Sequence, residues 1–315
     1  MTCMEELWGM GPVIEVALIV AGLLVLSTLV VLGLRLALPG RNWKELQDRV
    51  NAWWIMAALF LGAVSVATWV ALVFFGFLSF WALKEYVTLL RTRPADHKML
   101  FLAFCSIPVQ YYLVGIGWYG LFIIFVPVYV FLLLPFTLVL ARDPKGFVAS
   151  ASQIQWGLMA FVFGLSHMAY LLKLPPPGTG LADGRSMLLF LVFITEMSDV
   201  LQYVWGKLLG RHKILPTISP NKTWEGFLGG VASVAGLGFL LRFLTPFGTW
   251  ESAGVAALIA LAGFCGGAVM SAVKRDYGTK DFGAVIPGHG GVLDRVDSLC
   301  YSAPLFFHCV RYFYA

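Results

Sequence analysis

Long apolar segments constrain this chain more than any other feature of its sequence. A helix that spans a bilayer needs about 20 mostly apolar residues. Such segments fill most of the chain, and only 12% of its residues are charged, against about 25% in a soluble domain. The sequence therefore predicts an all-α, polytopic integral membrane bundle of about ten transmembrane helices, with nine as the alternative. The segments lie at 13–35, 53–70, 72–90, 99–116, 119–140, 153–172, 186–206, 225–245, 252–272 and 294–313.

Basic residues give the predicted orientation of the helices. Lysine and arginine gather in five connections, near 35–49, 91–98, 142–145, 207–222 and 274–295. Cytoplasmic loops carry an excess of these residues, so we place all five connections in the cytoplasm. An even number of spans must then separate them, and 53–90 must hold two helices or a re-entrant pair. Ten spans with both termini outside satisfy this pattern.

The chain divides, on this interpretation, into two membrane-spanning parts. Residues 1–180 form an N-terminal bundle, and residues 181–315 form a second bundle with two long cytoplasmic loops, 207–224 and 273–293. Both loops are dense in Lys, Arg, Gly and Pro. The spans between them place both loops on the same face, so we expect them to share one site.

Acidic residues inside the apolar segments are candidate functional groups. Each charge in a membrane helix costs roughly 2.5–3.5 kcal/mol on insertion scales, so it is retained for a reason. Two pairs have i,i+3 spacing, which puts each pair on one helix face. Carboxylates next to lysine-rich loops suit magnesium, which takes oxygen ligands and substrate phosphates. The alternative is that they only neutralise basic residues at helix ends. The pairs are Glu196 with Asp199, and Asp294 with Asp297.

Two loop features are suited to phosphate. The segment after Pro216 opens a helix, and backbone N–H groups at a helix N-terminus bind phosphate, with Lys222 adding a full charge. Glycines at 288, 290 and 291 flank His289 and leave a backbone that a ligand can approach closely. Each feature alone is weak, because a glycine-rich loop is more often a simple turn.

The combined pattern resembles the signature of the phosphatidate cytidylyltransferase (CDP-diacylglycerol synthase) family. The resemblance covers about residues 199–300 and includes Ser219–Gly226 and the group Asp199, Tyr203, Gly206 and Lys207. The 27-residue segment 271–297 agrees with the signature at Ser271, Lys274, Arg275, Lys280, Asp281, Gly283, Pro287, His289, Gly290, Gly291, Asp294, Arg295 and Asp297.

The resemblance implies a reaction in which CTP and phosphatidic acid give CDP-diacylglycerol and pyrophosphate, with Mg²⁺ alone or with a second, monovalent cation. It implies no nucleic-acid partner; membrane lipids surround the chain, and a homodimer is left open. The implied place is the bacterial inner (cytoplasmic) membrane, with the active site facing the cytoplasm. Carried over, the catalytic residues are Asp294, Asp297, Lys274, Arg275, Lys280, Asp281 and His289. The substrate-binding residues are Ser219, Asn221, Lys222, Ser271, Gly290, Gly291, Arg295 and Tyr203, and the expected metal ligands are Asp294, Asp199 and Glu196.

Two departures from the family pattern mark this chain as a divergent member, with a degenerate, inactive copy as the alternative. Residues 200–202 replace the small residues usual between Asp199 and Tyr203. Gly267 stands where the family usually has an acidic metal ligand, four residues before Ser271. We expect Glu196, one turn before Asp199, to supply a carboxylate in its place. Two rival functions remain: a related CTP-dependent enzyme acting on another lipid phosphate or lipid alcohol, and an ion-coupled transporter. A transporter would spread broken helices through the membrane midplane, whereas the charge here concentrates in two loops.

Overall fold

The computed structural model describes residues 11–40, 42–174 and 183–314 and confirms a polytopic helical membrane fold. Within these residues, eight helical segments are long and apolar enough to cross a bilayer. They are α2 (Gly11–Ala37), α3 (Lys44–Val66), α4 (Thr68–Leu89), η1 with α5 (Pro94–Asp96, His97–Gly115), α6 with η2 and α7 (Tyr119–Ile124, Phe125–Val130, Phe131–Leu140), α8 with η3 and α9 (Phe147–Gly157, Leu158–Gly164, Leu165–Leu171), α10 (Gly184–Leu208) and α12 (Thr249–Asp276).

The ambiguous stretch 53–90 forms two separate helices. Ala67, in extended conformation with φ −161° and ψ 153°, separates α3 from α4. Helix α3 begins at Lys44, nine residues before the predicted boundary, within a segment that we had assigned to a basic connection. Its first two turns are polar, and Arg49 Nη2 lies 2.6 Å from Glu45 Oε1, an i,i+4 pair that supports a helix. The extra turns bring α3 to 23 residues, enough to span a membrane, and α4 has 22.

Two of the predicted spans, 225–245 and 294–313, contain shorter helices. Helix α11 (Trp224–Leu240) has 17 residues and is followed by the 3₁₀ turn η4 (Arg242–Leu244). The segment predicted at 294–313 is divided into α13 (Leu293–Val296) and α14 (Leu299–Tyr314). The division falls at Asp297 and Ser298, where the Ser298 N–H donates to Asp297 Oδ1 at 2.7 Å. Such local side-chain bonds compete with the helical backbone pattern.

Helices α10, α11, α12 and α14 pack into a unit that carries the two loops. Glycines on α11 allow close packing against α10, because a Cβ at Gly229 would lie 2.6 Å from the Trp205 ring. Small residues serve this purpose at helix interfaces in membranes. The Trp205 indole N–H also donates to Ser233 Oγ at 2.9 Å, which fixes the two helices together.

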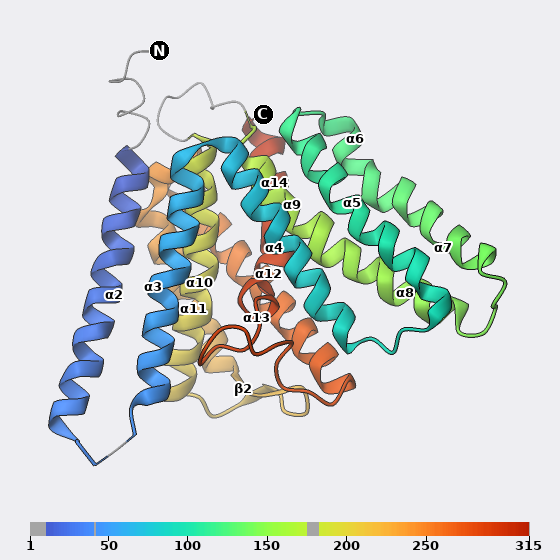
Figure 1. Cartoon of the computed structure of the whole chain (residues 1–315). Helices are drawn as coiled ribbons and strands as arrows, with labels where there is room; N and C mark the ends of the chain where they lie inside the picture. The colour runs from blue at the N-terminus through green and yellow to red at the C-terminus, as the bar shows by residue number, and fades with distance from the viewer. Residues whose placement is uncertain (1–10, 41, 175–182, 315) are drawn as a thin grey trace.

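The loop 207–224 contains a small β-hairpin that the sequence analysis did not predict. Strand β1 (Lys213–Leu215) pairs antiparallel with β2 (Ser219–Thr223), and Thr223 then caps α11 by accepting the Gly226 N–H at 3.1 Å. Figure 1 shows β2 and the loop between α12 and α13 at one end of the bundle, whereas the start of α2 and the end of α14 lie at the other end. The structure thus brings both loops to the same end.

This arrangement gives a topological prediction. Single cysteines introduced at Thr217 and Ala284, one in each loop, should react with a membrane-impermeant maleimide from the same side of oriented vesicles. Both sites are loop positions at one end of the bundle, and positive-inside placement makes that side cytoplasmic. A cysteine at Gly248, before α12, is the control and should label from the opposite side. Labelling of the two loops from opposite sides would contradict the fold.

Candidate active site

An ion pair between Lys274 and Asp294 lies at the centre of the second loop. Lys274 is in the last turn of α12, and Asp294 is in α13. Lys274 Nζ lies 2.8 Å from Asp294 Oδ1, with side chains that are only 13% and 3% exposed. Asp294 Oδ2 accepts two backbone N–H groups, from Phe282 and Gly291, at 2.9 Å each. Both carboxylate oxygens are therefore engaged within the protein, and they close the loop on itself.

The glycines of this loop are approached closely by the protein's own side chains. A Cβ at Gly290, where φ is +85°, would lie 2.8 Å from Asp294 Oδ2. At Gly288, where φ is +73°, it would lie 2.9 Å from Arg49 Cγ. Both positions need a left-handed backbone, which glycine adopts without steric cost. The close approach that we expected from a ligand is thus made here by Asp294 and Arg49.

A carboxylate from the N-terminal part of the chain holds the same loop. Glu85, on α4, is 3% exposed. Its Oε1 accepts the Val292 N–H at 3.0 Å, and its Oε2 accepts the Leu293 N–H at 2.8 Å. These two amides begin α13 and have no partner within their own helix. Glu85 therefore fastens the start of α13 to a helix 207 residues earlier in the chain.

Helix α3 makes a second contact with the loop. Arg49 Nε donates to the Gly288 carbonyl at 3.1 Å, and the Trp53 ring packs edge-on against His289 at 6.0 Å. Burial lowers the pKa of His289, and the positive charges of Arg295 and Arg49 lower it further. Arg49 and Trp53 thus bring the N-terminal part of the chain into contact with the loop around His289. The contacts from α3 and α4 cross the boundary that we predicted near residue 180.

A group of acids lies beside this loop. Ser298 Oγ donates to Asp199 Oδ2 at 2.8 Å, and the Ser298 backbone N–H is bonded to Asp297. Glu196 interacts electrostatically with Asp199, Arg295 and Asp297. Arg295 Nε is buried and has no hydrogen-bond partner in the described chain. A buried guanidinium N–H without an acceptor is costly, and a phosphate oxygen would satisfy it.

Lys222 extends from β2 toward this acid group. Its Nζ lies 4.5 Å from the Phe264 ring centroid and 3.4 Å from the Phe264 carbonyl. A Cβ at Gly267 would lie 3.1 Å from Lys222 Nζ and 3.5 Å from Ser298 Oγ. Burial lowers the pKa of Lys222, whereas the charges of Asp199 and Asp297 act in the opposite direction. The absent side chain at position 267 thus leaves space next to the lysine ammonium.

The first loop is fastened by a carboxylate as well. Glu225 Oε2 accepts the N–H groups of Arg211 and His212 at 3.0 and 3.2 Å, and His212 Nδ1 lies 2.5 Å from Glu225 Oε1. The two loops meet where Arg275 Nε donates to the Ile218 carbonyl at 3.3 Å. These contacts place the hairpin beside the end of α12.

The remaining predicted residues lie at the same end with looser contacts. Ser271 Oγ bonds back to the Gly267 carbonyl within α12 at 2.7 Å. Tyr203 is exposed, with Lys207 Nζ 5.7 Å from its ring centroid. The others form no ion pair within the described residues; Asn221, Lys280 and Asp281 are exposed, and Ser219 is half-buried.

The acids next to Ser298 have the oxygen donors that a hard cation requires. Among the described residues, no three His, Cys, Asp or Glu side chains converge as a complete metal site. Magnesium usually takes only one or two carboxylates and completes its shell with water and substrate phosphates. Asp199 and Asp297 each keep one oxygen outside the hydrogen bonds of the described chain. These two residues fit such a partial site, whereas Asp294 uses both oxygens elsewhere.

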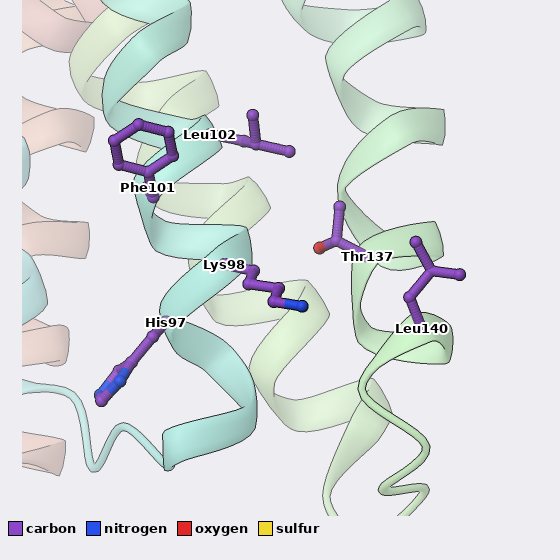
Figure 2. Close-up of a pocket in the computed structure, with 6 residues that line it drawn as sticks. All are labelled: His97, Lys98, Phe101, Leu102, Thr137 and Leu140. Carbon is purple, nitrogen blue, oxygen red and sulfur yellow. The ribbon is translucent and has the colours of Figure 1, made fainter.

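A separate groove lies between α5 and α7 and is drawn in Figure 2. It encloses about 440 Å³ and is lined by His97, Lys98, Phe101, Leu102, Thr137 and Leu140. Its lining includes none of the predicted site residues. The groove is nearly all apolar, as expected for a surface in contact with lipid.

Sequence reasoning missed the residues that hold the loop from outside. Glu85 carried a usable signal, because it is an acid within the predicted apolar segment 72–90, and such residues are functional candidates. Arg49 and Trp53 carried none, since a basic residue and an aromatic residue near a membrane surface are ordinary.

Similarity to known proteins agrees with the resemblance of the loops. Residues 47–313 match the Cytidylyltransferase family. The chain is 43% identical over 291 residues to "Uncharacterized protein YnbB" of Escherichia coli (strain K12), covering 92% of this chain and 95% of that protein. It is also 39% identical over 126 residues to "Phosphatidate cytidylyltransferase" of Staphylococcus aureus (strain COL), and 38% identical over 126 residues to that of Staphylococcus haemolyticus (strain JCSC1435). Each of these matches covers 39% of this chain and about half of the relative's length (48%).

The Lys274–Asp294 pair gives a prediction about stability. The change Asp294→Asn leaves Lys274 without its counter-ion at a site that is almost fully buried, which costs about 3–5 kcal/mol. The thermal unfolding midpoint of the purified protein in detergent should fall clearly. The control is Glu45→Gln, which removes an exposed pair worth at most about 1 kcal/mol. Equal midpoints for Asp294→Asn and the native chain would show that the pair does not hold the loop.

Proposed function

The chain belongs to the cytidylyltransferase family of nucleotidyltransferases, and we propose that it transfers CMP from CTP to phosphatidic acid, giving CDP-diacylglycerol and pyrophosphate. The substrate assignment follows the relatives named phosphatidate cytidylyltransferase, whose matching segment of 126 residues is 39% of this chain. The chain is an integral membrane protein, and we place its site at the cytoplasmic face of the bacterial inner membrane.

The observation that carries the proposal is the meeting of cations and acids at one end of a membrane bundle. Lys222 reaches the acid group from β2, and Arg295 reaches it from α13. Lys274 and Arg275 end α12 beside the hairpin. A triphosphate and a lipid phosphate together carry several negative charges, and Lys and Arg are the side chains that bind such groups. Because the chain lies in the membrane, the phosphate of a lipid headgroup would lie at the membrane surface, close to the end of the bundle that carries these residues.

The proposed reaction needs positioning more than it needs a strong base. An oxygen of the lipid phosphate attacks the α-phosphorus of CTP, and the bond from that phosphorus to the bridging oxygen of the β-phosphate breaks. Pyrophosphate leaves with the bond electrons. Because the attacking phosphate is already ionised, no proton has to be removed, which agrees with a binding or loop-ordering role for His289 rather than that of a base. Arg295 and Lys222 would neutralise charge that develops between the two phosphates.

A magnesium ion would be held by Asp199 and Asp297, with Glu196 beside them. When bound, it supplies positive charge that neutralises the phosphates and orients them. Glu196 has no hydrogen bond in the described chain and interacts with both aspartates, so it is available as the replacement carboxylate that Gly267 calls for. Asp294, which the sequence analysis assigned to the metal, is proposed instead to shape the loop through Lys274 and two backbone amides.

The acceptor is tested with the purified protein, labelled CTP, magnesium and a panel of lipid acceptors. The panel contains phosphatidic acid, a polyprenyl phosphate, lysophosphatidic acid and diacylglycerol. We expect one lipid-linked CMP product, CDP-diacylglycerol, and an equal amount of pyrophosphate. Product from diacylglycerol would instead indicate a CTP-dependent lipid kinase, and product from the polyprenyl phosphate alone would assign another acceptor. No release of pyrophosphate with any lipid would overturn the proposal.

Lys222 gives a prediction about CTP use. Lys222→Ala should lower kcat/KM for CTP by roughly ten- to a hundredfold, because a charged hydrogen bond to a phosphate contributes about 1.5–3 kcal/mol. The variant should fold normally, since Lys222 forms no ion pair in the described chain. Lys213→Ala is the matched control: it lies in β1 of the same hairpin but is exposed, and its kinetics should stay unchanged. Equal CTP kinetics for both variants would remove Lys222 from the site.

A further inference from the structure

Glu85 is a buried ionisable residue that the proposed reaction does not use. It lies on α4, in the part of the chain before residue 180, and its side chain contacts the second loop through both oxygens. A third bond, from Trp81 Nε1 to Glu85 Oε1 at 3.1 Å, holds the carboxylate from its own helix. An ionisable side chain this deeply buried is retained only when its bonds compensate the cost of burial.

The loop is shaped to receive this carboxylate. A Cβ at Gly283 would lie 2.7 Å from Glu85 Oε1, and a Cβ at Gly291 would collide with Glu85 Oε2. Any other residue at these two positions would push the carboxylate away. Two glycines of the loop are therefore explained by Glu85, without a ligand.

Glu85 and Asp294 together occupy four backbone amides of the loop. Glu85 takes Val292 and Leu293, and Asp294 takes Phe282 and Gly291. An incoming phosphate cannot bind these amides unless it displaces a carboxylate. Phosphate binding at this end of the site is left to side chains, and their positions depend on how the loop is held.

We propose that Glu85 is a positioning residue for nucleotide binding. Glu85 anchors the start of α13 to α4. It thereby fixes the position of Arg295, which follows the bound Leu293 amide by two residues. It also sets the place of the Asp294–Lys274 pair. The N-terminal bundle is thereby a structural part of the site. The contact itself stands on the geometry, whereas its effect on CMP transfer rests on the proposed function.

The test compares Glu85→Gln with the native protein in detergent. A glutamine keeps one acceptor oxygen but turns an NH₂ group toward one of the two backbone amides. Hydrogen–deuterium exchange of the segment 282–294 should rise roughly tenfold or more, because bonds to a charged acceptor are lost. Exchange in α11, which does not contact Glu85, should change little. In CTP kinetics, KM should rise by roughly tenfold with a smaller change in kcat, since the loop positions groups that hold the bound nucleotide.

Two control variants distinguish a positioning role of Glu85 from a general loss of folded structure. Trp81→Phe removes only the third bond to Glu85, so loop exchange and KM should stay as in the native protein. Gly291→Ala displaces the same carboxylate from the loop side and should reproduce Glu85→Gln, which keeps the test decisive if the glutamine variant does not fold. Its matched control is Gly254→Ala in α12, where a Cβ would meet nothing within 4 Å.

The outcomes are distinguishable from those of the proposed function. Unchanged exchange over 282–294 in Glu85→Gln overturns the anchoring role, and faster exchange with an unchanged KM overturns the positioning role. CTP alone should slow exchange of the native loop, which needs no acceptor lipid and no turnover. If CTP gives no protection in the native protein, the proposed function is at fault, and the exchange comparison still decides whether Glu85 anchors the loop.

Discussion

Carboxylates that accept backbone amides hold the two functional loops, and the rest of the site depends on them. Irregular backbone at the end of a membrane bundle lacks the regular hydrogen bonds of helices and strands, and each unpaired buried N–H costs free energy. Glu225 satisfies the amides of Arg211 and His212 in the first loop. Glu85 and Asp294 satisfy four amides in the second. The loops are thus fixed by negatively charged groups, which have the same sign of charge as the phosphates of the proposed substrates.

This choice of anchors has an electrostatic consequence. A carboxylate that has both oxygens bonded to amides or to a lysine has little capacity left for a cation, so Asp294 acts within the fold. The acids around Ser298 are bonded through fewer atoms and face Lys222 and Arg295. The site therefore separates acids that shape the backbone from acids that remain open. Phosphates would bring negative charge to two half-buried cations, Lys222 and Arg295, and electrostatic interactions are stronger there than in bulk water.

The sequence was sufficient for the membrane fold, and insufficient for how the loops are held. Apolar length located the eight long helical segments, since a bilayer imposes that length; the prediction for 13–35, for example, corresponds to α2 at Gly11–Ala37. The start of α3 at Lys44 was missed because its first turns are polar. The contact of Glu85 with Val292 joins positions 207 residues apart, and no local pattern encodes such a distance. The short hairpin was missed because Ser-Pro-Asn-Lys has no strand periodicity.

Position 267 shows how one missing side chain changes which charged groups of the site are paired. An acid there would begin 3.1 Å from Lys222 Nζ and would pair with it directly. With glycine, the ion pairs of the described chain do not include Lys222, whose ammonium is held by the Phe264 ring and carbonyl instead. Burial then lowers the pKa of Lys222 because it disfavours the charged ammonium. A phosphate that bound beside Lys222 would stabilise this charged form. On the proposed function, Gly267 would leave the metal with one carboxylate fewer and would leave Lys222 without a pairing acid, so that its ammonium could bind a phosphate of the substrate. Glu196, on α10, interacts electrostatically with Asp199, Arg295 and Asp297, so it could supply the missing carboxylate to the metal without pairing directly with Lys222.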